Sequence, residues 1–191
     1  TRKAGVQDEG SQLVAQIFSQ VAADQEAWLD LCAGPGGKAA LLSAIAKSKN
    51  IEFSANEISE VRAKLVRQVV QGAEVTTVDA RELSTLGQAY GAILADVPCT
   101  GLGALRRRPE VRWRRTVADL KSLVLPQAEI IDSAIACLSP GGILGYATCS
   151  PHLSETRIAI SEALKRHPDM ELVDLTSFIH PDLRTSAVNR G

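Results

Sequence analysis

The sequence predicts an α/β fold: a doubly wound, mostly parallel sheet with helices on both faces. Short apolar segments typical of buried strands alternate with segments of helical periodicity along most of the 191 residues. The intervals between strands are long enough for crossover helices, and right-handed crossovers between parallel strands produce this architecture. The chain is 45% hydrophobic and 23% charged and has no internal repeat or Gly/Ser linker, so one ordered globular domain is expected.

The first half of the chain alternates helix and strand. Apolar residues at helical spacing predict a helix over residues 11–21, and a short apolar strand follows at residues 27–32. A glycine-rich turn then leads into a helix at residues 38–47. The same reasoning predicts a strand at 51–56, a helix at 59–71, a strand at 74–78, a polar loop, and a strand at 91–95.

The second half contains one long helix and two further strands. Residues 117–138 have helical periodicity, and Pro126 is expected to kink this helix or divide it in two. The Ser-Pro-Gly-Gly segment at residues 139–142 is expected to end the helix and to lead into a strand at 143–148. A helix over residues 154–166 and a strand over residues 170–175 complete the prediction.

In a sheet of this kind, ligands bind beyond the carboxyl ends of the strands. Five successive strand ends carry glycines, carboxylates or thiols, at residues 30–38, Glu57, Asp79, residues 96–99 and Cys149. Any one of them could be an ordinary turn residue. Five in succession indicate a functional edge.

The first three of these strand ends predict an adenosine-containing cofactor. The turn from Gly34 to Lys38 presents backbone N–H groups at a helix N-terminus, where an anion is stabilised, but Ala39 excludes a Walker A loop. Glu57 lies 20 residues after Gly37, the spacing at which an acid bonds both ribose hydroxyls. Asp79 would accept a hydrogen bond from an adenine amino group. NAD and S-adenosylmethionine both satisfy this pattern.

The four cysteines have neither a C-x-x-C pair nor zinc-ligand spacing, so free thiols and no metal site are expected. Cys137, on an apolar helix face, and Cys32, at the end of the first strand, fit small core residues. Cys99 and Cys149 instead lie in loops just past two strand ends that would be neighbours in this topology. They are therefore candidate nucleophiles.

Two thiols beside Asp96 favour methyl transfer to a pyrimidine over hydride transfer, which requires neither thiol. A thiolate that adds to carbon 6 of cytosine makes carbon 5 nucleophilic enough to accept a methyl group. Asp96 would bond the ring nitrogen and amino group of the base, and a second thiol would assist as the carbon 5 proton leaves and the enzyme is released. S-Adenosylmethionine is accordingly the favoured cofactor.

The sequence resembles the RNA (cytosine-5)-methyltransferases of the Fmu/Sun group, which use S-adenosylmethionine. The matching segments are Gln-Asp-Glu-Gly-Ser-Gln at residues 7–12, Leu-Asp-Leu-Cys-Ala-Gly-Pro-Gly-Gly-Lys at 29–38, Asp-Val-Pro-Cys-Thr-Gly-Leu-Gly at 96–103, Arg-Arg-Pro-Glu-Val-Arg-Trp at 107–113 and Tyr-Ala-Thr-Cys-Ser at 146–150. Together they cover most of the chain from residue 7 to residue 157.

The resemblance implies a Rossmann-like class I methyltransferase fold and a role for each residue of the site. It implies that Asp96 also faces the cytosine, that Cys149 is the nucleophile and that Cys99 assists product release. The residues alone leave the order of the two cysteines open. The cofactor site implied by the resemblance is lined by Cys32, Ala33, Gly34, Pro35, Gly36, Gly37, Lys38, Glu57, Asp79 and Asp96.

The sequence departs from the family at three places. After Thr-Cys-Ser the family usually continues with Glu-Glu-Asn, whereas here Glu155 is followed by Thr156 and Arg157, which leaves a minor supporting contact in doubt. A closing strand with an Asp-Gly-Phe-Phe-like motif and an N-terminal RNA-binding domain are both missing, and the chain begins at Thr1. We therefore expect residues 1–191 to be a catalytic-domain fragment.

Charge is unevenly placed along the chain. The formal net charge is −1, but residues 106–115 alone contribute +5, so the other 181 residues carry −6. This segment directly follows the loop at residues 96–99, which favours phosphate contacts that are salt-dependent and weakly sequence-specific. Trp113 is expected to pack against the sheet rather than stack on a base. The arginines expected to bind RNA are Arg106, Arg107, Arg108, Arg112, Arg114 and Arg115.

The leading hypothesis is methyl transfer from S-adenosylmethionine to carbon 5 of an unstacked cytosine in structured RNA, ribosomal in preference to transfer RNA. The alternatives are a nicotinamide-dependent oxidoreductase and a catalytically silent RNA-binding module. Seven aromatic residues are too few for a sheet that reads RNA by stacking. The sequence has no signal peptide and no membrane-spanning apolar run, so a cytoplasmic protein is expected, whose oligomeric state is left open.

Overall fold

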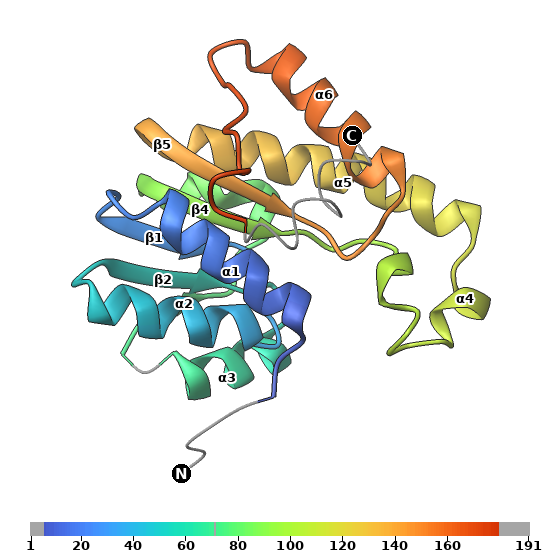
Figure 1. The fold of residues 1–191 in the computed structure, drawn as a ribbon, viewed down its shortest axis with the longest axis horizontal. Helices are drawn as coiled ribbons and strands as arrows, with labels where there is room; N and C mark the ends of the chain where they lie inside the picture. The colour runs from blue at the N-terminus through green and yellow to red at the C-terminus, as the bar shows by residue number, and fades with distance from the viewer. Residues whose placement is uncertain (1–5, 71, 180–191) are drawn as a thin grey trace.

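A computed structural model describes residues 6–70 and 72–179, and it contains a five-stranded sheet in the order β3-β2-β1-β4-β5 (Figure 1). All four strand pairs are parallel. The predicted doubly wound α/β fold is therefore confirmed. The strands are β1 (Ala27–Asp30), β2 (Glu52–Asn56), β3 (Glu74–Thr76), β4 (Tyr90–Asp96) and β5 (Leu138–Ala147).

Helices cover both faces of the sheet and form a three-layer structure (Figure 1). One face packs against α1 (Glu9–Val21), α2 (Gly37–Ser48) and α3 (Glu60–Val69). The other packs against the 3-10 segment η1 (Ala80–Leu86) and α5 (Val117–Ala136), and α6 (Arg157–Arg166) lies on α5. Short helical turns in the connecting loops are η2 (Leu102–Ala104), α4 (Val111–Arg114) and η3 (Leu153–Glu155).

The alternation of side chains along the central strands divides the core into two clusters. Trp28 and Leu94 belong to the cluster under α1, α2 and α3, whereas Leu29 and Ile93 belong to the cluster under η1 and α5. Successive strand residues point to opposite faces, so strands covered on both sides must be apolar almost throughout. This explains why the central strands read as continuous apolar runs.

The strand order locates the ligand-binding edge. From β1 the chain moves outward to β2 and β3, then crosses the sheet to β4 on the other side of β1. The direction of winding therefore reverses between β1 and β4, and the crevice at such a point is where doubly wound sheets bind ligands. Asp30 ends β1 and Asp96 ends β4, so both carboxylates lie at this crevice.

Two of the sequence predictions in the second half of the chain are wrong, and a third is resolved. Residues 170–175 are not part of the sheet of the described residues, because no strand pairs with them there. Residues 139–142 lie inside β5, which pairs with β4 from Leu138 onward. The long helix continues through Pro126 without division. The predicted helix end at residue 71 lies outside the described residues.

The start of α5 shows how this long helix is fixed next to the arginine segment. Thr116 accepts a hydrogen bond from the backbone N–H of Asp119, and the Asp119 side chain accepts one from the backbone N–H of Thr116. This reciprocal capping satisfies two N–H groups that the first turn of a helix otherwise leaves unpaired.

None of the helices in residues 6–70 and 72–179 combines the length and the apolar composition that a membrane-spanning segment requires.

Replacing Leu94 by alanine should destabilise the fold by about 2–5 kcal/mol, because it opens a cavity under α1 at a side chain that is 1% exposed. Urea denaturation measures the change. Val61 on α3 is 75% exposed, so Val61→Ala is the matched control and should stay within about 0.5 kcal/mol. Equal losses in the two variants would contradict the packing described for β4.

Candidate active site

The pairing of β4 with β5 brings the two predicted thiols together. Asp96 is in register with Ala147, and the backbone N–H of Val97 donates to the Ala147 carbonyl at 3.0 Å. The loops that leave these two strands therefore start side by side. They place the Cys99 Sγ 3.3 Å from the Cys149 Sγ.

The hydrogen bond between the two thiols shifts their pKa values in opposite directions. The hydrogen bond from Cys149 lowers the pKa of Cys99 to about 6 against the effect of partial burial, with further help from Thr148 and from the backbone N–H groups of Gly101 and Cys149. The same bond, followed by burial, raises the pKa of Cys149. Near neutral pH the pair is therefore a Cys99 thiolate that accepts a hydrogen bond from the Cys149 thiol. Cys149 is the more exposed of the two.

Lys38 and Asp96 form an ion pair across the crevice. Lys38 lies in the first turn of α2, and its Nζ is 2.6 Å from the Asp96 Oδ2 and 3.3 Å from the Ser11 Oγ. The pair links the glycine-rich turn after β1 to the end of β4. It also fixes the orientation of the Asp96 carboxylate, three residues before Cys99.

Asp30 is a buried carboxylate whose oxygens have no donor in hydrogen-bonding geometry among the described residues. The residue is 1% exposed. Burial, followed by repulsion from the nearby Asp96, raises the pKa of Asp30 to about 7, and Lys38 and the backbone N–H of Cys32 oppose this rise only in part. An unpaired buried carboxylate is costly, so this position fits a cationic ligand group.

The glycine-rich turn brings the chain close to α3. Gly36 has φ +112°, and a Cβ at this position would lie 2.8 Å from the Val69 Cγ2, so a side chain would be strained and would clash. Gly37 begins α2 directly afterwards. The first N–H groups of this helix have no partner within it and favour an anionic group at its end.

Glu57 and Asp79, the two carboxylates expected to contact adenosine, are both paired with arginines. Glu57 is buried, accepts from the backbone N–H of Gly34 at 3.0 Å and lies 2.7 Å from the Arg62 guanidinium. Asp79 lies 2.6 Å from the Arg81 guanidinium, and hydrogen bonds from Arg81 lower the pKa of Asp79. Adenosine would have to share these carboxylates or displace the arginines.

The other two cysteines behave as packed residues. Cys137 is buried in the cluster under η1 and α5, as predicted. Cys32 is half-buried, and burial together with the neighbouring Asp30 and Glu57 carboxylates raises its thiol pKa well above the usual value. Neither thiol is activated as a nucleophile.

The six arginines of residues 106–115 are exposed. Two of them also attach the arginine segment to the rest of the protein. The Arg115 Nε donates to the Thr100 carbonyl at 3.0 Å, and the Arg107 guanidinium lies 3.3 Å from the Asp8 carboxylate. The segment therefore lies directly beside the Cys99 loop. The prediction that Trp113 packs against the sheet is wrong, since Trp113 is 82% exposed and lies against the Arg112 guanidinium at 5.5 Å.

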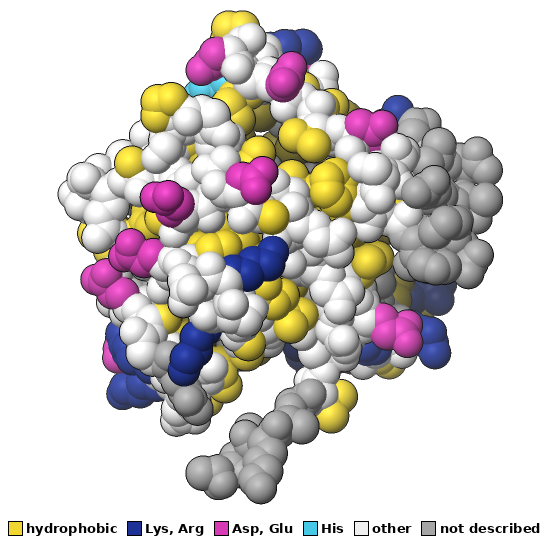
Figure 2. Space-filling model, turned by 60° about the vertical axis from the view of Figure 1, so that its left-hand side comes forward, with side chains coloured by type: hydrophobic (Ala, Val, Ile, Leu, Met, Phe, Trp, Pro, Cys, Tyr) yellow, Lys and Arg dark blue, Asp and Glu magenta, His cyan; other side chains and the backbone are white. Residues whose placement is uncertain are grey.

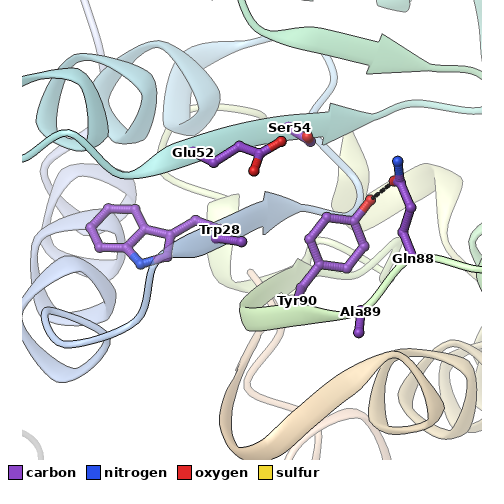
Figure 3. Close-up of a pocket in the computed structure, with 7 residues that line it drawn as sticks. Trp28, Glu52, Ser54, Gln88, Ala89 and Tyr90 are labelled. Carbon is purple, nitrogen blue, oxygen red and sulfur yellow. Dashed lines mark hydrogen bonds between the residues drawn. The ribbon is translucent and has the colours of Figure 1, made fainter.

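The opposite edge of the sheet has a different character. Figure 2 is turned toward the left-hand side of Figure 1, where the strands begin, and acidic side chains are scattered over the upper and left parts of that face. A hollow of about 220 Å³ lies at this edge, between the first residues of β1, β2 and β4. Figure 3 shows the Tyr90 hydroxyl there beside Gln88, to whose Oε1 it donates at 2.6 Å. This hollow contains no thiol pair.

Glu155 has a larger structural role beside the thiols than its sequence context indicates. The departure from the family at Thr156 and Arg157 leaves only a minor supporting contact in doubt, but Glu155 is fully buried and its carboxylate accepts from the backbone N–H of Thr100 at 2.8 Å. The sequence signal for Glu155 is its place in the acidic family pattern after Thr-Cys-Ser, which says nothing about burial.

Among the described residues, no group of three or more His, Cys, Asp or Glu side chains could hold a metal ion.

The sheet order and the ligand edge define a Rossmann-like class I methyltransferase fold. Residues 19–188 match the family described as 16S rRNA methyltransferase RsmB/F, and the chain belongs to this family of S-adenosylmethionine-dependent RNA (cytosine-5)-methyltransferases. The resemblance found in the sequence motifs is therefore confirmed.

Individual relatives support this assignment. Rv1407, a proposed methyltransferase of Mycobacterium tuberculosis, is 51% identical over 170 residues, which are 87% of this chain and 37% of the relative. Ribosomal RNA small subunit methyltransferase B of Vibrio cholerae is 37% identical over 174 residues, which are 88% of this chain and 39% of the relative. The crystal structure of NSun6 from Pyrococcus horikoshii with SFG superposes with a TM-score of 0.74 at 27% identity, covering 84% of this chain and 41% of that one. The chain thus spans about two fifths of the length of these relatives.

The raised pKa of Asp30 predicts a pH-dependent loss of stability. The pKa of Asp30 is about 7 in the folded protein and about 4 in the unfolded chain, so between these pH values only the folded protein keeps the proton. The stabilisation from this proton is complete below pH 4, decreases as pH rises, and is lost once pH has passed through 7. Relative to Asp30→Asn, wild-type stability should fall by up to about 4 kcal/mol between pH 4 and pH 8. Urea denaturation at several pH values measures the difference. Parallel curves for the two proteins would contradict it.

The hydrogen bond between Cys99 and Cys149 predicts that the reactivity of Cys99 depends on its partner. Replacing Cys149 by alanine removes the donor that lowers the Cys99 pKa, so Cys99 should lose most of its thiolate at pH 6.5. The higher nucleophilicity of a less acidic thiol offsets part of this loss, so alkylation by iodoacetamide should slow about fivefold. Peptide-resolved mass spectrometry measures the rate, and Cys137→Ala is the control that should leave it unchanged.

Proposed function

We propose that this chain transfers a methyl group from S-adenosylmethionine to carbon 5 of a cytosine in structured RNA. The observation that carries the proposal is the thiol pair at 3.3 Å, next to the Asp96 carboxylate, at the edge where doubly wound sheets bind ligands. A covalent route to cytosine requires a nucleophilic thiol and a proton acceptor close to it. The family assignment argues against the nicotinamide-dependent alternative.

Ribosomal RNA is the favoured substrate class. The matching family is described as 16S rRNA methyltransferases, and the Vibrio cholerae relative is named for the small-subunit ribosomal RNA. Transfer RNA is the alternative. The exposed arginines next to the Cys99 loop would bind phosphates of either RNA, so selection of the target would depend on RNA shape and on other parts of the protein.

The residues at the crevice fit S-adenosylmethionine. The unpaired Asp30 carboxylate suits the ammonium group of its methionine part, and the N-terminus of α2 suits the carboxylate. Glu57 and Asp79 are the acceptors for ribose and adenine once Arg62 and Arg81 share them or move aside. When bound, the cofactor supplies an electrophilic methyl group.

The protein residues perform the remaining steps. The Cys99 thiolate takes the thiol proton of Cys149, and the Cys149 sulfur forms a bond to carbon 6 while the electron pair of the carbon 5–carbon 6 double bond moves to carbon 5. Asp96 accepts a hydrogen bond from the cytosine amino group. After methylation the carbon 5 proton passes to a base, the double bond re-forms and the bond to Cys149 breaks. Cys99, once deprotonated again, is placed to act as that base.

Replacing Cys149 by serine or alanine should abolish methylation, and replacing Cys99 by alanine should let a covalent protein–RNA adduct accumulate. The first change removes the attacking sulfur, and the second removes the group that assists release. Transfer of labelled methyl to RNA measures activity, and denaturing gels reveal the adduct. Cys137→Ala is the control, since Cys137 lies in the core. Normal methylation by the Cys149 variants would refute the mechanism.

The RNA target is tested in cells. Bisulfite sequencing of total RNA with and without the gene should reveal one or more cytosines that lose protection when the gene is absent. A protected cytosine in ribosomal RNA would support the favoured substrate class, and one in transfer RNA would favour the alternative. RNA binding without loss of any protected cytosine would instead favour a catalytically silent RNA-binding module.

A further inference from the structure

Glu155 is the one fully buried carboxylate among the described residues whose hydrogen bonds connect both cysteine loops. It lies in η3, between β5 and α6, and is 0% exposed. Its backbone is held as well, because the Tyr146 hydroxyl donates to the Glu155 carbonyl at 2.8 Å. A carboxylate in such a place must be fully hydrogen-bonded to remain charged.

The carboxylate holds the residue that follows Cys99 directly, and the residue that follows Cys149 through it. The Glu155 Oε1 accepts from the backbone N–H of Thr100 at 2.8 Å, and the Oε2 accepts from the Thr100 hydroxyl. The Ser150 hydroxyl contacts the Thr100 hydroxyl at 3.1 Å, and because the Thr100 hydroxyl donates to the carboxylate, Ser150 is linked to Glu155 through Thr100. Thr100 directly follows Cys99 and Ser150 directly follows Cys149, so one anion holds the first loop directly and the second through the Thr100 hydroxyl.

A third element completes the network. The Gln127 Nε2, on α5, donates to the Glu155 Oε1 at 3.1 Å and to the Pro98 carbonyl at 2.8 Å. Burial would raise the pKa of Glu155, but the nearby Ser150 hydroxyl and the hydrogen bonds from Thr100 and Gln127 together lower it, so the group is a carboxylate. The network thus links the β4 loop, the β5 loop and α5 through a charged acceptor.

We propose that Glu155 is a positioning residue that sets the distance and orientation of the Cys99 and Cys149 thiols by holding Thr100 directly and Ser150 through the Thr100 hydroxyl. This inference rests on the proposed methyl transfer for its functional meaning. Glu155 is not a catalytic residue, because among the described residues its carboxylate accepts hydrogen bonds from Thr100 and Gln127 and contacts neither sulfur. Its effect on the reaction passes through the geometry of the thiol pair.

The test measures thiol proximity separately from methylation. Diamide accepts two electrons and two protons from a pair of thiols, becomes a hydrazine derivative and leaves a disulfide, so its rate of producing a Cys99–Cys149 disulfide depends on how the two sulfurs are held. In the intact protein we expect Glu155→Gln to slow this rate at least fivefold, because an amide has one acceptor oxygen in place of two. Thr100→Val, which removes only the hydroxyl, should slow it less. Mass spectrometry of the cross-linked peptide gives the rates.

Methylation and cofactor binding provide the second readout. If the wild type methylates RNA, kcat of Glu155→Gln should fall at least tenfold while the calorimetric Kd for S-adenosylmethionine stays within twofold. The matched control is Glu162→Gln, an exposed carboxylate on α6 paired with Lys165 on the surface, which should leave both the disulfide rate and kcat unchanged.

The outcomes separate the two proposals. A folded Glu155→Gln protein with a wild-type disulfide rate would overturn the positioning role even if its activity fell. If Glu155→Gln does not fold, an unchanged rate in Thr100→Val overturns it and a slowed rate supports it. If the wild type methylates no RNA, the proposed function fails, and the disulfide rates still decide whether Glu155 holds the thiols.

Discussion

The parallel pairing of β4 with β5 is the constraint on which the rest of the site depends. Because Asp96 and Ala147 are in register, the two strands end at the same height and their loops begin next to each other. The 3.3 Å contact between the thiols is a consequence of this register. A slip of one residue would turn every side chain of β5 to the other face, so the apolar core under α1 and α5 also protects the geometry of the thiols.

Much of the fold and part of the site follow from the sequence for a shared reason. Strands covered on both faces must be apolar, so β1 and β4 are readable from composition alone, and parallel strands bring their ends to one edge. The closeness of Cys99 and Cys149 to each other follows from that topology. The failures have physical causes too: residues 170–175 have the composition of a strand, but pairing needs a partner that composition cannot supply. Trp113 is exposed because α4 is a single turn outside the core.

The burial and the charge state of the acidic residues near the site could not be predicted from the sequence. Asp30 and Glu155 are both buried acids, yet their environments have opposite effects: among the described residues Asp30 has no donor in hydrogen-bonding geometry and its pKa rises, whereas Glu155 has several and its pKa falls. The difference depends on side chains that come from distant segments. The pairing of Glu57 with Arg62 and of Asp79 with Arg81 likewise depends on side-chain conformations that the sequence does not reveal. The local sequence identifies the acids but not what they contact.

β5 occupies the end of the five-stranded sheet of the described residues, and its side chains are less buried than those of β4. An edge strand presents N–H and C=O groups that can pair with another strand, and a ten-residue edge is long for a globular protein. Natural sheets protect such edges with charges, bulges or a covering segment. Here Pro140 and the glycines at 141 and 142 interrupt the ladder near its start, where the register with β4 is also irregular. The remaining half of the edge, from Ile143 to Ala147, has no charged residue, so its own sequence does nothing to discourage another strand from pairing with it.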